Sequence, residues 1–228
     1  MVGIFDSGMG GVAALNFFKK LAPDTDVVFF ADKENAPYGT KSESELIPLV
    51  INDIDKLRKF GAEKILIACC TASAVYEQLG KEHKCGVIPI IDPVARVACA
   101  VSRTGRIGII STEATMRSGG FVKAIKRELP SANTVSASSR ILVTLAERGA
   151  KDENLTSSER SVIAKELLPL LSAEVDTVVL GCTHFSYFRE TVEDILGIPA
   201  VDSAEIGAEV LNEKIKPYPV GEGRTIYI

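Results

Sequence analysis

The stretch KILIACCTASA, Lys64 to Ala74, places two adjacent cysteines where a run of apolar residues ends. The four consecutive apolar residues Ile65–Ala68 are typical of a short strand that is buried on both faces of a parallel sheet. Cys69 and Cys70 follow directly, and the small residues after them indicate a turn into a helix. The stretch therefore predicts a thiol pair at the carboxyl end of a parallel strand, where α/β proteins bind their ligands.

A second cysteine segment later in the chain has the same form. Val178–His184, with the sequence VVLGCTH, is similar to Ile65–Thr71, with the sequence ILIACCT. In the same way, VGIFDSGMGG at Val2–Gly11 is similar to IGIISTEATMRSGG at Ile107–Gly120. The two pairs have similar offsets along the chain, which indicates two related α/β halves that each present one cysteine. Chance similarity between short strands is the alternative explanation.

Short apolar runs alternate with longer amphipathic segments along most of the chain. This order predicts an α/β fold of two pseudo-symmetric parallel-sheet domains that face a central cleft. The first domain is expected at residues 1–91 plus 204–228 and carries Cys69, and the second at 92–203 carries Cys182. Strands are predicted at Val2–Phe5, Val27–Ala31, Ile65–Ala68, Val87–Ile91, Arg106–Ile110 and Val175–Leu180. Helices are predicted at Gly11–Leu21, Ser42–Phe60, Thr115–Glu128, Thr156–Leu171 and Phe185–Leu196, the second and fourth with capping boxes at their starts.

Composition limits the class of protein. The 228 residues are 46% hydrophobic and 25% charged, the balance of an ordinary globular protein. The net charge of −4 and the scattered lysines and arginines argue against a nucleic-acid partner. No apolar run approaches the roughly 20 residues of a membrane span, so no membrane association is expected. The N-terminus has no charged leader, and the five cysteines form no disulfide framework, so we expect reduced thiols in the cytoplasm.

Two thiols on opposite walls of a cleft are suited to acid–base chemistry at a carbon atom. One thiolate can remove a proton from an acidic carbon while the opposite thiol returns a proton to the other face. That exchange inverts a stereocentre without a cofactor. The ordinary pKa of cysteine, about 8.5, is within reach of neutral pH, and a helix N-terminus lowers it further. The predicted strand-to-helix turns would place both cysteines at such positions.

Five motifs, in order, resemble the cofactor-independent aspartate/glutamate racemase superfamily, and its glutamate racemases in particular. They are GIFDSGMGG, APYGT, ACCTAS, STEATMRSG and GCTHF, and the resemblance covers roughly residues 2–213. It implies racemisation of an acidic amino acid, L-glutamate to D-glutamate first, which in bacteria supplies peptidoglycan. It implies no cofactor and no metal, and a homodimer is expected.

The resemblance also implies roles for individual residues. Cys69 and Cys182 fall on the two catalytic thiols, each the base for one enantiomer. Asp6 falls on an acid that supports the first thiol, and His184 falls on the residue that supports the second. The remaining positions implied to contact the substrate or line its site are Ser7, Pro37, Tyr38, Gly39, Cys70, Thr71, Thr112, Thr115, Glu147 and Thr183.

The chain departs from the family pattern in ways that bear on the substrate. Cys70 stands where the family has an asparagine, and Ser186 stands where it has a proline. A thiol is a weak donor and cannot replace both hydrogen-bonding faces of an amide. One alternative is therefore racemisation of aspartate or another amino acid, or activity on a malonate- or hydantoin-like acid. A non-catalytic protein that binds a carboxylate ligand is the other alternative.

Two further hypotheses fit the spacing less well. Cysteines 69, 70 and 182 with His184 match no standard zinc-ligand spacing. The GMGG turn after the first strand lacks the spacing of a nucleotide-binding loop, so a substrate carboxylate is expected there instead.

Overall fold

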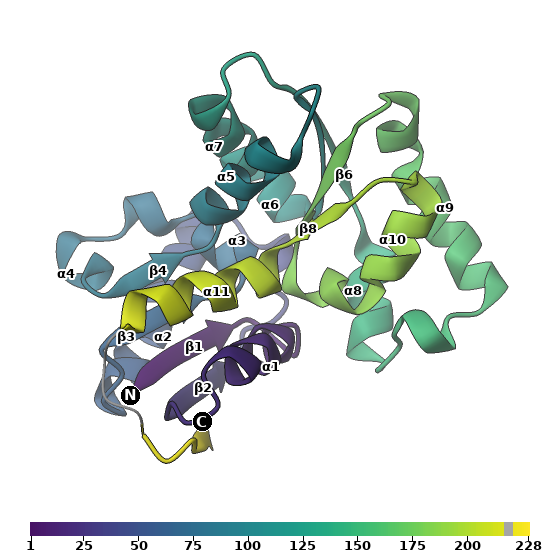
Figure 1. The fold of residues 1–228 in the computed structure, drawn as a ribbon. Helices are drawn as coiled ribbons and strands as arrows, with labels where there is room; N and C mark the ends of the chain where they lie inside the picture. The colour runs from purple at the N-terminus through teal and green to yellow at the C-terminus, as the bar shows by residue number, and fades with distance from the viewer. Residues whose placement is uncertain (217–220) are drawn as a thin grey trace.

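The computed structural model describes residues 1–216 and 221–228, which form two parallel sheets with helices on their faces (Figure 1). Of the C-terminal segment expected in the first domain, residues 217–220 lie outside the described part. The first sheet has the strand order β4-β3-β1-β2-β9. Its strands are β1 Val2–Asp6, β2 Val27–Ala31, β3 Lys64–Ile67, β4 Val87–Pro89 and β9 Thr225–Tyr227. The first four of these confirm predicted strands, with ends shifted by a residue or two.

The second sheet has the order β6-β5-β7-β8, again entirely parallel. Its strands are β5 Arg106–Ser111, β6 Asn133–Ser138, β7 Thr177–Gly181 and β8 Ala200–Asp202. Strands β5 and β7 are confirmed predictions, whereas β6, β8 and β9 were not predicted. Strand β6 is largely polar and lies at the edge of the sheet, and the other two have three residues each, so none carries a clear apolar run.

The two sheets repeat one topology. In the first, β1 lies between β2 and β3, and β4 follows β3; in the second, β5 lies between β6 and β7, and β8 follows β7. The similar sequence segments occupy equivalent places, since they form β1 and β5 in one pair and β3 and β7 in the other. Each sheet therefore reverses its strand order between the two strands that carry the repeated motifs, and in such sheets ligands bind at this point.

Helices bury apolar side chains against both faces of each sheet. Helices α1 and α11 pack together on one face of the first sheet, and α2 covers the other (Figure 1). Helices α5 and α7 pack on one face of the second sheet, and α8 and α9 on the other. The long helices are α1 Gly11–Leu21, α2 Glu43–Lys59, α5 Ile91–Val101, α7 Gly120–Glu128, α8 Arg140–Glu147, α9 Ser157–Ser172, α10 Arg189–Leu196 and α11 Ser203–Ile215. The short ones are α3 Cys70–Ser73, α4 Lys81–Lys84, α6 Glu113–Ser118 and the 3₁₀ turns η1 Tyr38–Thr40, η2 Tyr76–Gln78, η3 Asp152–Asn154 and η4 Thr183–Phe188.

Two helix predictions need correction. The segment expected as one helix at Thr115–Glu128 is two helices, because Gly119 adopts a left-handed conformation with φ of 64° and ends α6. The segment expected at Phe185–Leu196 begins as the 3₁₀ turn η4 and becomes α-helical at Arg189. The helix predicted at Ser42–Phe60 is confirmed as α2, which continues through Pro48.

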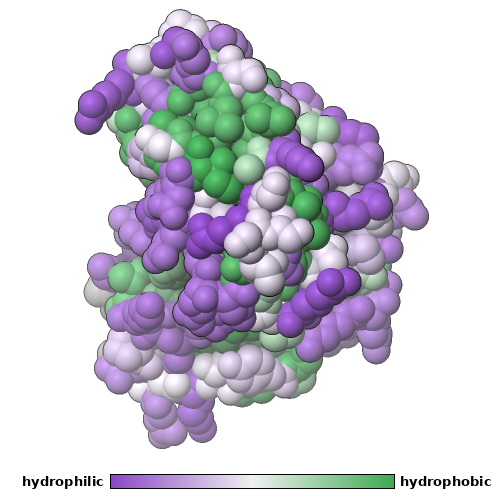
Figure 2. Space-filling view, turned by 90° about the vertical axis from the view of Figure 1, so that its right-hand side faces the viewer, coloured by the Kyte–Doolittle hydropathy of each residue, from purple (hydrophilic) through white to green (hydrophobic). Residues whose placement is uncertain are grey.

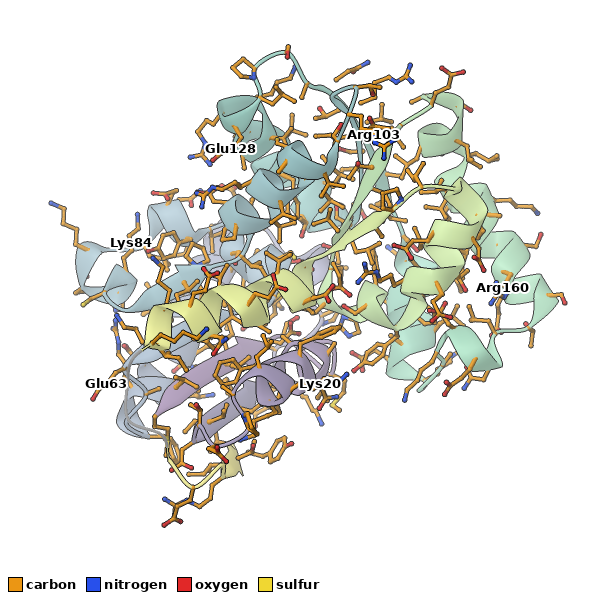
Figure 3. All side chains as sticks on the ribbon, in the orientation of Figure 1. Lys20, Glu63, Lys84, Arg103, Glu128 and Arg160 are labelled. Carbon is orange, nitrogen blue, oxygen red and sulfur yellow. The ribbon has the colours of Figure 1, made fainter. Side chains whose placement is uncertain are left out.

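Charged side chains are distributed around the outside of the molecule. The labelled residues of both signs, Lys20, Glu63, Lys84, Arg103, Glu128 and Arg160, lie around the periphery of the ribbon (Figure 3). Across residues 1–216 and 221–228, no helix combines the length and the apolar character that crossing a membrane requires.

Candidate active site

Four segments from the carboxyl ends of the strands of both sheets meet where the halves of the molecule contact each other. Asp6 ends β1, and Cys69 follows β3. Thr112 follows β5 in the second sheet, and Cys182 follows β7. Both thiols are nearly inaccessible, with exposed fractions of 6% for Cys69 and 7% for Cys182. The residues predicted from the motifs are thus brought to one buried region.

Asp6 links the two halves. It is fully buried, its Oδ1 accepts a hydrogen bond from the Gly8 amide at 2.9 Å, and its Oδ2 accepts one from the Thr183 hydroxyl at 2.9 Å. Burial raises the pKa of Asp6, while the nearby His184 ring and these two donors oppose that rise. The charge of Asp6 also raises the pKa of both Cys69 and Cys182. The two thiols therefore share one buried carboxylate as an electrostatic neighbour.

Cys69 lies at the start of α3, with its Sγ 3.4 Å from the Ser7 hydroxyl oxygen. Burial, followed by the charge of Asp6, raises the pKa of the Cys69 thiol to about 11. Burial also raises the pKa of Cys182 well above its usual value. Backbone amides at the two turns, those of Ala72 and His184, do lower the pKa of Cys69 and Cys182, as expected. The loss of solvation on burial is the larger effect, so the net pKa of each thiol is raised.

Cys182, His184 and Glu147 form a chain of contacts across the second half. The Nδ1 atom of His184 lies 3.6 Å from the Cys182 Sγ, and its Nε2 atom lies 2.5 Å from Oε1 of Glu147. The hydrogen bond to His184 is the main cause of a lowered pKa for Glu147, so Glu147 is ionised and Nε2 carries the shared proton. In the neutral ring Nδ1 is then an acceptor that faces the thiol.

Three threonine hydroxyls connect the halves beside the thiols. Thr71 Oγ1, on α3, lies 3.0 Å from Oγ1 of Thr112 and 2.9 Å from Oγ1 of Thr115. The Thr112 hydroxyl donates to that of Thr115 at 2.9 Å, which closes a triangle. All three are predicted site residues, and together they supply donors that could bind a carboxylate. A cavity of about 100 Å³ lies beyond Thr71, lined also by α2 and α6.

The loop that contains Pro37, Tyr38 and Gly39 reaches this region through its main chain. The Tyr38 side chain is 1% exposed and belongs to the apolar core of the first sheet, so any substrate contact from Tyr38 would come from its main chain. Gly39 abuts Thr112, since a Cβ atom at Gly39 would lie 3.0 Å from the Thr112 Cβ.

Cys70 lies in an apolar part of the second half of the site. It is buried in the cluster that contains Ile90, Ile91 and Phe121. Burial raises its pKa beyond the ordinary range, so its thiol stays protonated. A charge on Cys70 would also raise the pKa of Cys182, which places Cys70 near the second thiol. All five cysteines are free.

A family model supplies the identification. The model described as Asp/Glu/Hydantoin racemase matches residues 16–211. The chain belongs to this family.

Relatives within the family agree with this assignment. The glutamate racemase of Geobacter metallireducens is 37% identical over 219 residues, which cover 94% of this chain and 80% of the relative. The crystal structure of a glutamate racemase isoform from Bacillus anthracis matches with a TM-score of 0.87 at 28% identity, covering 100% of this chain and 86% of that one. The Escherichia coli glutamate racemase, solved with L-glutamate and an activator, matches with a TM-score of 0.76 at 27% identity, covering 99% and 88% of the two chains.

Two residues with a role near this site were missed in the sequence. Asp53, on α2, is fully buried and contacts the Tyr38 hydroxyl, and Asp32 contacts the same hydroxyl. Asp53 could have been found, because it lies on the same helical stripe as Val50, Ile54 and Leu57, where a charged residue is unexpected.

The described residues also bear on metal binding. Within residues 1–216 and 221–228, no three or more His, Cys, Asp or Glu side chains are grouped so that they could hold a metal ion.

Proposed function

We propose that this family member interconverts L- and D-glutamate by a two-thiol mechanism without a cofactor. The observation that carries the proposal is the pair of buried thiols, Cys69 and Cys182, which follow equivalent strands of the two sheets and share Asp6 as a neighbour. The relatives named above are glutamate racemases, and one of them was solved with L-glutamate. In a bacterium, this activity would supply D-glutamate for peptidoglycan.

The proton transfers balance between the two thiols. In one direction, the Cys69 thiolate takes the α-proton and becomes a thiol, while the Cys182 thiol gives its proton to the opposite face of the carbon and becomes a thiolate. In the other direction the two roles are exchanged. His184 can take the proton of Cys182 through Nδ1, because Glu147 holds the ring with Nε2 as the donor.

The raised thiol pKa values require help from the substrate. Both thiols are protonated at neutral pH. Burial raises the pKa of Cys69 to about 11, and it raises the pKa of Cys182 well above its usual value. The substrate ammonium, bound beside Asp6, would place a positive charge near the thiols and favour a thiolate, and Asp6, whose pKa burial raises, would take the proton that leaves Cys69. The hydroxyls of Thr71, Thr112 and Thr115 would donate to a carboxylate and stabilise the charge that develops at the α-carbon.

We further propose the wider setting of the enzyme. The chain divides into one domain of residues 1–91 plus 204–228 and another of residues 92–203, with the substrate between them. Five free cysteines suit a reducing compartment, so the site of action would be the cytoplasm. The functional unit would be a homodimer, for which exposed apolar side chains on α9 offer contact surface.

Proton exchange in D₂O tests the activity directly. The reduced protein is incubated with the L and D forms of glutamate, aspartate and other amino acids, NMR follows loss of the α-proton signal, and circular dichroism follows inversion. We expect exchange with inversion of glutamate. Exchange with another acid alone would change the substrate, and no exchange with any of them would contradict an amino-acid racemase.

Single-thiol variants test the mechanism. We expect Cys69→Ala and Cys182→Ala each to abolish racemisation, because each removes one of the two acid–base groups. Cys85→Ala is the matched control, since Cys85 is exposed and away from the site, and it should keep full activity. Normal racemisation by either site variant would contradict the two-base mechanism.

One observation favours a second candidate substrate. Cys70 is buried among apolar side chains and has a thiol where the family pattern has an asparagine, so it offers the substrate no amide at that position. Aspartate or another amino acid is therefore the alternative, and the same panel of amino acids decides between them.

A further inference from the structure

Three side chains form a buried polar cluster beneath the loop that contacts Thr112. The Tyr38 hydroxyl oxygen lies 2.6 Å from Oδ2 of Asp32 and 2.7 Å from Oδ2 of Asp53. All three side chains are buried, and they come from separate parts of the first half of the chain. We call this set the Tyr38 cluster. None of its members takes part in the proton transfers described above.

The number of protons in the Tyr38 cluster constrains its charge. A tyrosine hydroxyl has one proton, so it can donate to only one of the two carboxyl groups. The other short contact is a hydrogen bond only if that carboxyl group is protonated and donates to the tyrosine oxygen. Burial, and then the neighbouring carboxylates, raises the pKa of Tyr38, so the hydroxyl itself stays neutral. The cluster therefore contains one neutral carboxylic acid.

The surroundings assign that proton to Asp53. Asp32 accepts two further contacts from the Asn35 amide, at 3.0 and 2.9 Å, which suit an ionised carboxylate. Asp53 has no such donors: among the described residues, none hydrogen-bonds to its buried Oδ1. Burying a charged carboxylate oxygen without a hydrogen-bond donor costs much free energy, whereas burying the carbonyl oxygen of a neutral acid costs far less.

We infer that Asp53 is a positioning residue: as a neutral acid it donates to Tyr38, which donates to Asp32, and the pair of bonds holds the Pro37–Gly39 loop against Thr112. Gly39 directly follows Tyr38 in the chain and lies against Thr112. Fixing the Tyr38 side chain therefore also fixes the position of Gly39 beside Thr112. Thr112 in turn is hydrogen-bonded to Thr71 and Thr115. Asp53 thus acts on the site through Tyr38 and not by touching the substrate.

This arrangement depends on pH. Burial raises the pKa of Asp53 to about 7; the Tyr38 hydrogen bond and the charge of Lys56 oppose the rise, and the charge of Asp32 adds to it. Because the folded-state pKa is above the ordinary value, the contribution of Asp53 to stability is complete below about pH 3.9 and is lost as pH rises toward 7. Above pH 7, Asp32 and Asp53 are both anionic and Tyr38 can bond to only one of them.

Substitutions at Asp53 test the inference. Asp53→Asn keeps a neutral donor, so it should retain loop protection and remove the pH dependence. Asp53→Leu and Tyr38→Phe remove the bonds and should expose the loop at every pH. Hydrogen exchange of residues 36–41 and unfolding in urea are measured at pH 5 and pH 8. Between these values the ratio of folded to unfolded protein should fall at least about tenfold more in the wild type than in Asp53→Asn.

A measurement of activity rests on the proposed function, whereas the measurements of amide hydrogen exchange and of unfolding in urea do not. If glutamate is the substrate, KM should rise roughly fivefold in Asp53→Leu and, above pH 7, in the wild type, but not in Asp53→Asn. Asp55→Asn, at a half-buried neighbouring position on α2 whose side chain is largely solvent-accessible, is the matched control and should behave as the wild type. The inference is overturned if Asp53→Asn exposes the loop as Asp53→Leu does, or if its unfolding changes with pH as the wild type's does.

Discussion

At the scale of single residues, glycines in the first loop decide how closely the site can assemble. A Cβ atom on Gly10 would lie 2.4 Å from the Thr183 hydroxyl oxygen and 2.7 Å from Nδ1 of His184. A Cβ atom on Gly11 would lie 2.4 Å from that of Asp6. The GMGG turn, expected to bind a substrate carboxylate, therefore has a packing role at these two positions: it brings α1 against the residues that hold the second thiol.

Gly10→Ala tests this close approach. Gly10 has helical angles, φ −56° and ψ −36°, which alanine adopts without strain, so any cost must come from the clash. We expect the free energy of unfolding to fall by about 1–3 kcal/mol and racemisation to fall strongly, because His184 must move. Urea unfolding and activity assays measure both. Gly197→Ala is the control: its Cβ would meet no atom, so only left-handed backbone strain of about 1–2 kcal/mol is expected, with activity retained. An equal loss of activity in Gly10→Ala and Gly197→Ala would contradict the clash with His184 as the cause.

At the scale of elements, local chemistry sets the ends of the helices that were predicted most accurately. Both predicted capping boxes are present: Ser42 with Glu45 begins α2, and Thr156 with Glu159 begins α9. In α9 the Glu159 amide donates to Thr156 Oγ1 at 3.2 Å, and the Thr156 amide donates to the Glu159 carboxylate at 2.9 Å. These contacts satisfy amides that a helix start leaves unpaired.

Thr156→Ala should lower the free energy of unfolding by about 1 kcal/mol, because the first turn of α9 loses a side-chain acceptor. Racemisation should not change, since Thr156 lies at the exposed start of α9 and its side chain bonds to Glu159 of the same helix. Ser161→Ala, an exposed site within the same helix, should change stability by less than about 0.5 kcal/mol. Urea unfolding compares the two, and an effect at Ser161 as large as that at Thr156 would rule out capping as the cause.

At the scale of the whole molecule, repetition of one strand order places two equivalent strand ends opposite each other. Asp6, bonded to Thr183, and Thr71, bonded to Thr112 and Thr115, join the halves at the site by hydrogen bonds. The same scale governs assembly. Figure 2 shows an apolar area on the side of the molecule where Figure 1 places α9, and Leu168 and Leu171 of that helix are 54% and 39% exposed.

Substitution of that surface tests the proposed homodimer. We expect the wild type to have twice the monomer mass in size-exclusion chromatography with light scattering. Replacing both Leu168 and Leu171 with glutamate should yield a monomer, because two charges would be buried at the interface. Val101→Glu places a charge at an exposed apolar site on α5 and should leave the dimer intact. A monomeric wild type would contradict the homodimer, and a dimeric double variant would exclude this surface.

The sequence by itself determined the fold class, most central strands, the capped helix starts and the motif segments that the structure brings together at the candidate site. These features follow from local signals: apolar runs, capping residues and motifs next to strand ends. It could not determine the short or polar strands β6, β8 and β9, whose residues form a strand only because a neighbouring strand supplies hydrogen bonds. Tertiary structure alone decided the ionisation of the site. Burial raises the pKa of both thiols and of Asp53, and burial arises from packing between segments far apart in the chain.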